Sequence, residues 1–271
     1  MTKLVYIGGY GHSGSTLLEY LLASSPEVVA CGEVVSVPRE RGRKAKCTCG
    51  RLAQDCPVWG PLQTSPGALD GWTHERLTLA LLERVCGAHA VMVDSSKTPW
   101  SSAAAPFRLH RKLGADFQLL HIVRDPRAVS WSAIKKAGRK GKRPLIALRG
   151  VVAALSWSVS NLACALFGRM HPDRYIQLRY EDLTRDPNEV MQRLFAKLLP
   201  GVEWRPEAIG SGENRHQLYG NRMRSQTLTL AEIKEDASWK SDMPPASRAL
   251  VAALTFPLRR LYSFPEAGKA G

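Results

Sequence analysis

Short, continuous runs of apolar residues alternate along this chain with longer segments whose apolar residues recur at helical spacing. Buried strands are predicted at residues 4–7, 28–31, 91–93, 117–123 and 175–178. Helices are predicted from residue 15, over 74–87, over 103–113, from 126, over 150–168, and from 187 to about 199. This alternation predicts an α/β fold in one domain over residues 1–271, with a parallel, P-loop-like sheet flanked by helices.

Two of the predicted helices begin with an acidic residue followed by proline. Asp125 precedes Pro126, and Asp186 precedes Pro187. Each carboxylate can accept hydrogen bonds from free backbone N–H groups, and the proline fits the first helical position. Glu189 follows Asp186 at the spacing of a capping box. These signals fix where both helices start.

Three stretches lack a clear period. Residues 38–70 are rich in Arg, Lys, Gly, Pro and Cys, which is typical of an irregular insertion where acceptor specificity can reside. Residues 135–143 are a basic break before the long apolar helix. The chain after Gly201 is polar up to Thr229, with helical segments expected near residue 231 and over 246–254.

Charge and targeting signals narrow the class of protein. A formal net charge of +14 indicates an anionic ligand, acceptor or surface, and the chain lacks the aromatic–basic pattern of a nucleic-acid binder. The N-terminus runs directly into the first strand without a secretory signal. The uncharged run 150–168 carries three serines and an asparagine, so we expect a buried core helix and no membrane span. The expected location is cytoplasmic.

The cysteines leave three alternatives open. Cys47, Cys49 and Cys56 are clustered in sequence, with Cys31 nearby. They can be free thiols, as expected in a reducing compartment, a redox-sensitive disulfide pair, or ligands of a structural zinc ion. The Cys-x-Cys spacing differs from the common Cys-x2-Cys hairpin. The predicted chemistry requires no metal.

A glycine-rich turn joins the first strand to the first helix. Gly9-x4-Gly14-Ser15-Thr16 nearly fits the P-loop pattern, but Ser15 stands where the nucleotide-binding lysine belongs. Glycines let the backbone approach an anion, and the free amides at the helix start point toward it. The turn therefore suits a short 5′ anionic group and disfavours a kinase or ATPase. The alternative is a tight turn without a ligand.

In this turn the chain resembles sulfotransferases that use 3′-phosphoadenylyl sulfate (PAPS), among them bacterial, carbohydrate and tyrosylprotein enzymes. The resemblance implies that their 5′-phosphosulfate loop is formed here by Gly11, His12, Ser13, Gly14, Ser15 and Thr16, with His12 replacing the family's long cation. Arg124 and Ser132 have the spacing of the family's 3′-phosphate pair. A guanidinium at a strand's carboxyl end suits that contact on physical grounds too.

Two further segments extend the resemblance. Tyr180, in Tyr-Glu-Asp-Leu, matches a tyrosine near the family's adenine. Glu181 and Asp182 after it are expected to be structural, and Arg127 to be solvated. The segment Gly220 to Arg224 resembles a nucleotide-contacting segment of bacterial sulfotransferases. It adds Asn221, Arg222 and Arg224 to the binding residues and implies that the tail, about 201–271, caps the nucleotide.

Sulfuryl transfer needs a base for the acceptor hydroxyl and neutralisation of the leaving phosphate. The segment ending at Glu33 resembles one that ends in the catalytic glutamate of tyrosylprotein sulfotransferases, and Lys97 matches a lysine near the sulfuryl oxygens. His12 is a second candidate for neutralising charge, and alternatively for the base. The remaining histidines are expected to be surface or structural residues.

The resemblance therefore predicts transfer of the PAPS sulfuryl group to a hydroxyl, releasing 3′-phosphoadenosine 5′-phosphate (PAP). A small molecule, sugar or glycolipid is the expected acceptor. The sequence leaves open whether the chain forms a homodimer. The alternatives are a P-loop kinase and a non-catalytic nucleotide- or polyanion-binding protein.

Overall fold

A computed structural model of the protein describes residues 3–40, 45–65, 67–87, 90–98, 100–139, 146–209 and 214–264. Its centre is a parallel sheet with the strand order β2-β3-β1-β4-β5. The strands are β1 (Leu4–Gly8), β2 (Val28–Ala30), β3 (Val91–Asp94), β4 (Phe117–Val123) and β5 (Tyr175–Arg179). The predicted strands and the α/β class are thus confirmed.

The central strands are apolar throughout because both faces of the sheet are covered. Leu4 and Tyr6 of β1 point into one core cluster, and Val5 and Ile7 point into the other. Every residue of β1, β2, β3 and β4 is buried, as expected for a parallel sheet between two layers of helices.

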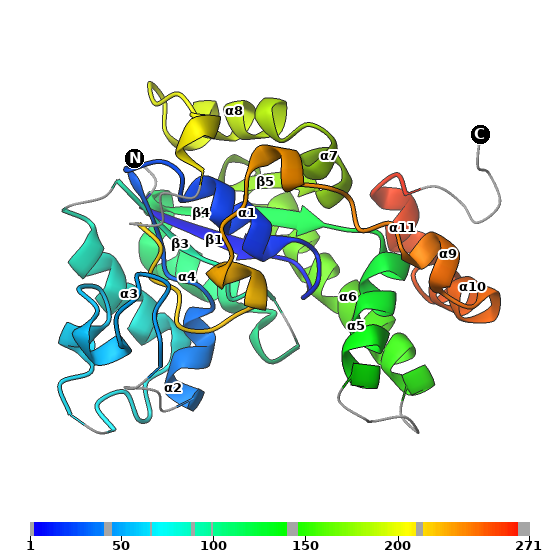
Figure 1. Ribbon diagram of the computed structural model, residues 1–271, viewed down its shortest axis with the longest axis horizontal. Coiled ribbons are helices and arrows are strands. Elements are labelled where there is room, and N and C mark those ends of the chain that lie inside the picture. The colour runs from blue at the N-terminus through cyan, green and yellow to red at the C-terminus, as the bar shows by residue number, and fades with distance from the viewer. Residues whose placement is uncertain are drawn as a thin grey trace.

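Helices form the two outer layers (Figure 1). Helices α1 (Ser15–Leu22), α7 (Tyr180–Arg185) and α8 (Pro187–Leu198) contribute residues to the core on one face. Helices α3 (His74–Val85), α4 (Ala105–Leu113) and α6 (Ile146–Met170) contribute to the core on the other. Helix α5 (Pro126–Arg139) lies beside α6. The predicted caps are present: Asp125 Oδ1 accepts from Arg127 N at 2.8 Å, and Asp186 Oδ1 from Glu189 N at 2.9 Å.

Helix α6 is less buried than expected. Its stretch Leu148–Met170 is long and apolar enough to cross a membrane, and half of that window is buried inside the protein. Trp157 and Phe167 lie in the core, whereas the opposite face exposes apolar side chains, among them Leu162 and Met170. The helix therefore covers the sheet with one face and leaves an apolar stripe on the other.

The insertion and the tail are packed against the body more closely than their composition suggested. The insertion contains the short helix α2 (Val37–Glu40) and 3-10 turns, and Trp59 within it is fully buried. In the tail, His216 N donates to Ala30 O at 2.7 Å and Ala30 N donates to Asn214 O at 2.9 Å, so residues 214–216 lie along the edge strand β2.

The end of the tail forms α9 (Trp239–Asp242), α10 (Pro245–Leu254) and α11 (Phe256–Leu261), at the right of Figure 1. Only α10 was expected as a helix at this position. The helix expected near residue 231 is a single 3-10 turn, Leu230–Glu232. The basic break predicted at 135–143 is wrong for residues 135–139, which continue α5, and residues 140–143 lie outside the described residues.

Candidate active site

The segments with predicted chemistry follow the carboxyl ends of all five strands. In an open parallel sheet this edge is where ligands bind. The glycine-rich turn follows β1, Glu33 follows β2, Lys97 follows β3, Arg124 follows β4, and Tyr180 follows β5. The topology alone therefore brings these five segments to the same edge of the molecule.

Two glycines shape the turn after β1. A Cβ on Gly9 would lie 2.4 Å from Ile122 O, and one on Gly14 would lie 2.4 Å from Tyr180 Cδ2. Both residues also have a positive φ, 113° and 93° respectively, which favours glycine. The turn can therefore pack against β4 and Tyr180 only with glycine at these two positions.

The turn presents donors without protein acceptors. Helix α1 begins at Ser15 with no side-chain cap on its first amides. Ser13 Oγ is buried and has no hydrogen-bond partner among the residues that the structure describes. A buried hydroxyl without a partner is costly, and an anion seated in the turn would supply the acceptor. Anion binding by the loop from Gly11 to Thr16 stays a prediction, which these two features support.

Arg124 and Ser132 contact this same turn. Arg124 Nη1 donates to His12 O at 3.0 Å, and Ser132 Oγ lies 3.0 Å from His12 Nδ1. Arg124 is 6% exposed, and its guanidinium lies 4.2 Å from the centre of the Tyr180 ring. Its Nη2 donates to Asp236 O at 2.8 Å. The two predicted phosphate-binding groups therefore belong to one site, with Tyr180 beside them.

His12 lies in a strongly basic environment. Burial is the main cause that lowers its pKa to about 4, and Lys136, Lys97 and Arg124 add repulsion. The imidazole is therefore neutral near pH 7 in the free protein. The sequence-based expectation of a cationic His12 concerned the state beside a bound anion, so it stays a prediction for that state.

Glu33 and Lys97 form an ion pair at the same edge. Lys97 has a φ of 67°, and its backbone is held by Lys97 N donating to Ile7 O at 3.2 Å and by the Tyr6 hydroxyl donating to Lys97 O. A Cβ on Gly220 would lie 3.7 Å from Glu33 Oε1. The two predicted catalytic groups are thus adjacent, with the tail segment beside them.

Glu19 is a buried residue of this site that sequence analysis missed. Its Oε1 accepts from Gly32 N at 2.7 Å, and its Oε2 accepts from Ser95 Oγ at 2.6 Å. Burial raises its pKa from 4.5 to about 7. Glu19 therefore connects α1 to the segments that carry Glu33 and Lys97. A carboxylate within the apolar pattern of α1 was the available signal.

The side-chain hydrogen bonds of Asn221 and Arg224, in the predicted nucleotide-contacting segment at 220–224, are made within that segment. Asn221 Oδ1 accepts from Met223 N at 3.1 Å and so caps the 3-10 helix Arg222–Ser225, and Arg224 Nη1 donates to Gly220 O at 3.3 Å. This turn packs against α1. The side chain of Arg222 lies outside the described residues.

One expectation about an individual residue was wrong. Arg127 is 3% exposed rather than solvated, because it pairs with Asp125 at 2.6 Å and lies over the Trp239 ring. His216 fits the structural alternative expected for the remaining histidines: it is buried, and its ring faces a group of cysteines. Glu181 fits the expected structural role, since Oε1 accepts from Asp125 N at 2.9 Å.

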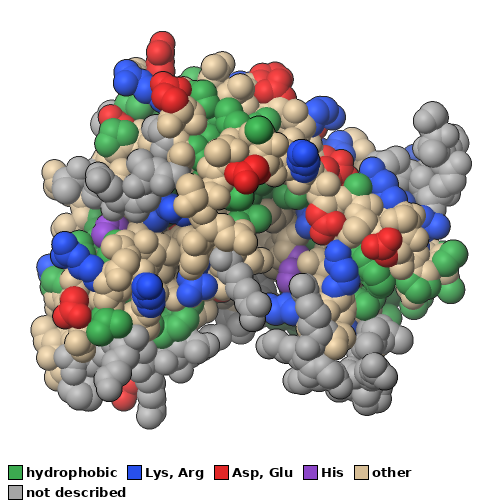
Figure 2. Space-filling view, in the orientation of Figure 1, with side chains coloured by type: hydrophobic (Ala, Val, Ile, Leu, Met, Phe, Trp, Pro, Cys, Tyr) green, Lys and Arg blue, Asp and Glu red, His purple; other side chains and the backbone are tan. Residues whose placement is uncertain are grey.

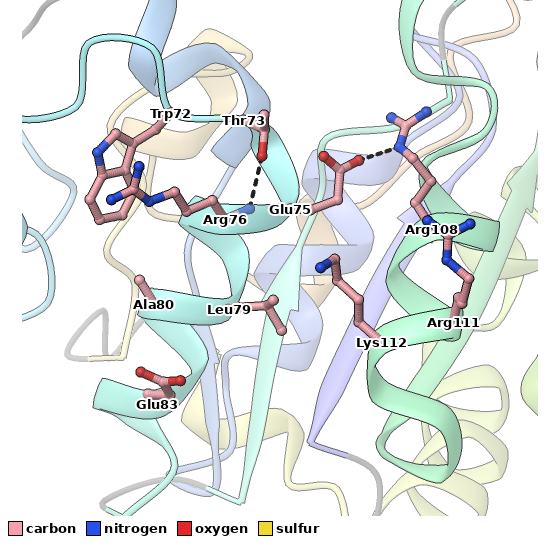
Figure 3. Close-up of a pocket in the computed structure, with 10 residues that line it drawn as sticks. All are labelled: Trp72, Thr73, Glu75, Arg76, Leu79, Ala80, Glu83, Arg108, Arg111 and Lys112. Atoms are coloured by element: carbon pink, nitrogen blue, oxygen red, sulfur yellow. Dashed lines mark hydrogen bonds and ion pairs between the residues drawn. The ribbon is translucent and has the colours of Figure 1, made fainter.

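Of two hollows on the described surface, one is lined in part by predicted site residues and the other is not. One, of about 250 Å³, is lined by Tyr10, His12, Lys136 and Arg149, and so lies beside the turn. Figure 2 shows basic side chains on both sides of the hollow between the α1 region and α5. The other, of about 540 Å³, lies between α3 and α4 (Figure 3), and none of the predicted site residues lines it.

The second hollow holds none of the predicted site residues, and one ion pair is formed among its described acids and bases. Glu75 pairs with Arg108, and Arg76 stacks on Trp72 at 4.1 Å from the ring centre (Figure 3). We therefore assign the candidate active site to the carboxyl edge of the sheet.

Comparison with known proteins agrees with this geometry. The family described as "Sulfotransferase family" matches residues 5–206, so the chain belongs to the sulfotransferase family. None of the curated proteins matches the chain.

Solved structures share the fold. The sulfotransferase domain from the curacin biosynthetic pathway has a TM-score of 0.60 and 21% identity, covering 98% of this chain and 99% of that one. The sulfotransferase domain from the Synechococcus PCC 7002 olefin synthase has a TM-score of 0.56 and 22% identity, covering 98% and 96%. Mouse sulfotransferase SULT7A1 complexed with PAP has a TM-score of 0.54 and 11% identity, covering 96% and 84%.

Proposed function

We propose that this sulfotransferase moves the sulfuryl group of PAPS to a hydroxyl of a small-molecule, sugar or glycolipid acceptor and releases PAP. The observation that carries this proposal is the contact between the two predicted anion-binding elements: Arg124 Nη1 and Ser132 Oγ, the predicted 3′-phosphate pair, each lie 3.0 Å from an atom of His12 in the glycine-rich turn. A site with two anion-binding elements suits a nucleotide with a phosphate at each end of its ribose. The PAP bound to the mouse relative supports the same donor.

The donor fits the side chains present. The buried Ser13 hydroxyl and the uncapped start of α1 would hold the 5′ end, and Arg124 with Ser132 would hold the 3′-phosphate. When bound, PAPS supplies the activated sulfuryl group. The nearby Lys97 ammonium would hold the sulfuryl oxygens, and His12 would hydrogen-bond the oxygen that leaves as phosphate.

The base is best assigned to Glu33. Its carboxylate takes the acceptor's hydroxyl proton while the acceptor oxygen forms its bond to sulfur and the bond from sulfur to the 5′-phosphate oxygen breaks. His12 is the weaker candidate because its Nδ1 already lies 3.0 Å from Ser132 Oγ. The ion pair with Lys97 holds the Glu33 carboxylate at this edge of the sheet.

The proposal is tested by incubating the protein with labelled PAPS and panels of sugars, glycolipids and small hydroxyl compounds. Transfer of label to any class, abolished in Glu33→Gln, supports it. Binding of PAP without transfer to any class would favour a non-catalytic nucleotide-binding protein. Phosphate transfer from ATP with Mg²⁺ would favour a kinase, which Ser15 argues against.

A further inference from the structure

Three cysteines of the insertion and one histidine of the tail converge, and none of them is a predicted transfer residue. The ligand atoms of Cys47, Cys49, Cys56 and His216 all lie within 4.8 Å of one another. Cys47, Cys56 and His216 are buried, and Cys49 is half-buried. Cys56 and His216 are 160 residues apart in sequence, so the fold itself builds this cluster.

We propose that these four residues bind a structural zinc ion that fastens the insertion to the tail. Three thiolates and one imidazole are a ligand set typical of tetrahedral structural zinc. With bonds of about 2.3 Å to sulfur and 2.0 Å to nitrogen, tetrahedral ligands are about 3.8 Å apart for two sulfurs and about 3.6 Å apart for sulfur and nitrogen. Cys47 Sγ and Cys56 Sγ are 3.7 Å apart, and Cys56 Sγ is 3.2 Å from His216 Nδ1.

Hydrogen bonds outside the cluster hold the ligands in place. Thr48, between the first two cysteines, donates from Oγ1 to Arg215 O at 2.6 Å and accepts from Gln217 N at 2.9 Å. The Trp59 indole donates to His216 O at 2.5 Å. Gly50, with a φ of 87°, allows the tight turn that places Cys47 and Cys49 on one side. These hydrogen bonds place the backbone of the insertion and of the tail so that the four ligand atoms can converge.

The structure favours zinc over the two other states that the cysteines allow. A disulfide between Cys47 and Cys56 would need the sulfurs about 2.0 Å apart and would leave Cys49 and His216 without a role. Free thiols would leave four metal-binding atoms converging by chance in a site that is largely buried. The ion needs no part in sulfuryl transfer, since the cluster is separate from the Gly11–Thr16 turn in sequence and holds none of its residues.

An ion bound to His216 would hold the tail segment that passes Glu33. Residues 214–216 lie along β2, and Gly220, four residues beyond His216, lies next to the Glu33 carboxylate. Fixing His216 to the insertion therefore limits the movement of the segment that runs past Glu33. Such a cross-link between distant parts of the chain stabilises the folded state.

The test is the metal content of full-length, tag-free protein after gel filtration in a weak chelator. We expect about one zinc per chain, falling below about 0.2 in Cys56→Ser and in His216→Asn, and unchanged in the control Cys86→Ser. Cys86 is a half-buried cysteine outside the cluster. Zinc removal should lower the melting temperature by roughly 5–10 °C and speed proteolysis within residues 214–225.

A second measurement keeps the test decisive if Cys56→Ser fails to fold. In wild-type protein, a mercurial that blocks thiols should release the zinc to a colorimetric indicator, and Co²⁺ reconstitution should give the visible bands of a tetrahedral thiolate site. Zinc-free protein from zinc-supplemented cells, iron in its place, a Cys47–Cys56 disulfide in the isolated protein, or zinc retained in His216→Asn would each overturn the proposal. None of these readouts depends on PAPS or on an acceptor.

Discussion

Replacing Arg124 with alanine tests the predicted 3′-phosphate contact. The guanidinium is 6% exposed and lies between the glycine-rich turn and the Tyr180 ring. A charge-assisted hydrogen bond contributes about 1.5–3 kcal/mol, and burial favours the upper part of that range. The Kd for PAP should therefore rise by about 10- to 150-fold in Arg124→Ala.

The ligand offers a matched comparison. Isothermal titration of both proteins with PAP and with AMP, which lacks only the 3′-phosphate, separates a contact to that group from a general loss of the site. We expect Arg124→Ala to lose most of its preference for PAP over AMP. Arg185→Ala serves as the control, because it removes the same charge from a side chain that is 75% exposed.

Two results would refute this reasoning. One is unchanged PAP affinity in Arg124→Ala. The other is an equal loss of affinity for PAP and AMP, which would show that Arg124 supports the shape of the turn and does not contact the 3′-phosphate. A thermal melt of each variant without ligand shows whether the protein is folded at the assay temperature, which matters because Arg124 also binds His12 O and Asp236 O.

Three further predictions concern Glu33, His12 and Glu19. Glu33→Gln should reduce kcat at least about 100-fold while changing the Kd for PAP less than about threefold; a kcat within tenfold of wild type would place the base elsewhere. Because a bound anion favours the cationic imidazole, PAP binding near pH 6 should take up a proton in the wild type that His12→Asn does not take up. Titrations in two buffers of different ionisation enthalpy measure this uptake, and equal uptake in both proteins would contradict it. Burial raises the pKa of Glu19 from 4.5 to about 7, so the folded state favours the protonated carboxyl group. The resulting stability is fully present below pH 4.5 and is lost as the pH rises through about 7. Between pH 5 and 8 the wild type should therefore lose up to about 3 kcal/mol more unfolding free energy than Glu19→Gln, as measured by denaturant titration; parallel curves would show that burial does not shift this carboxyl group.

Much of the fold was predictable because its signals are local. Each buried strand is a short apolar run, and the starts of α5 and α8 are marked by Asp125-Pro126 and Asp186-Pro187. The parallel order of the sheet then brings the residues after each strand to one edge. For this reason Arg124, at the end of a predicted strand, could be expected near the glycine-rich turn, and the resemblance to PAPS sulfotransferases added Ser132.

What the sequence did not reveal depends on contacts between distant segments. Glu19 was missed because its partners, Gly32 and Ser95, lie on two other segments. The solvated role expected for Arg127 was wrong because Trp239, which covers it, comes from a helix more than a hundred residues later. His216 joins the cysteines for the same reason: residues 214–216 run along β2, a pairing that no local pattern indicates.

The central claim is that one molecule of PAP lies with its 5′-phosphate in the turn from Gly11 to Thr16 and its 3′-phosphate on Arg124 and Ser132. A crystal structure of the protein with PAP tests this claim most directly. The account predicts density for one nucleotide that contacts Ser13 Oγ at one end and the Arg124 guanidinium at the other. Density in a different cleft, or a nucleotide that contacts only one of these two groups, would contradict it.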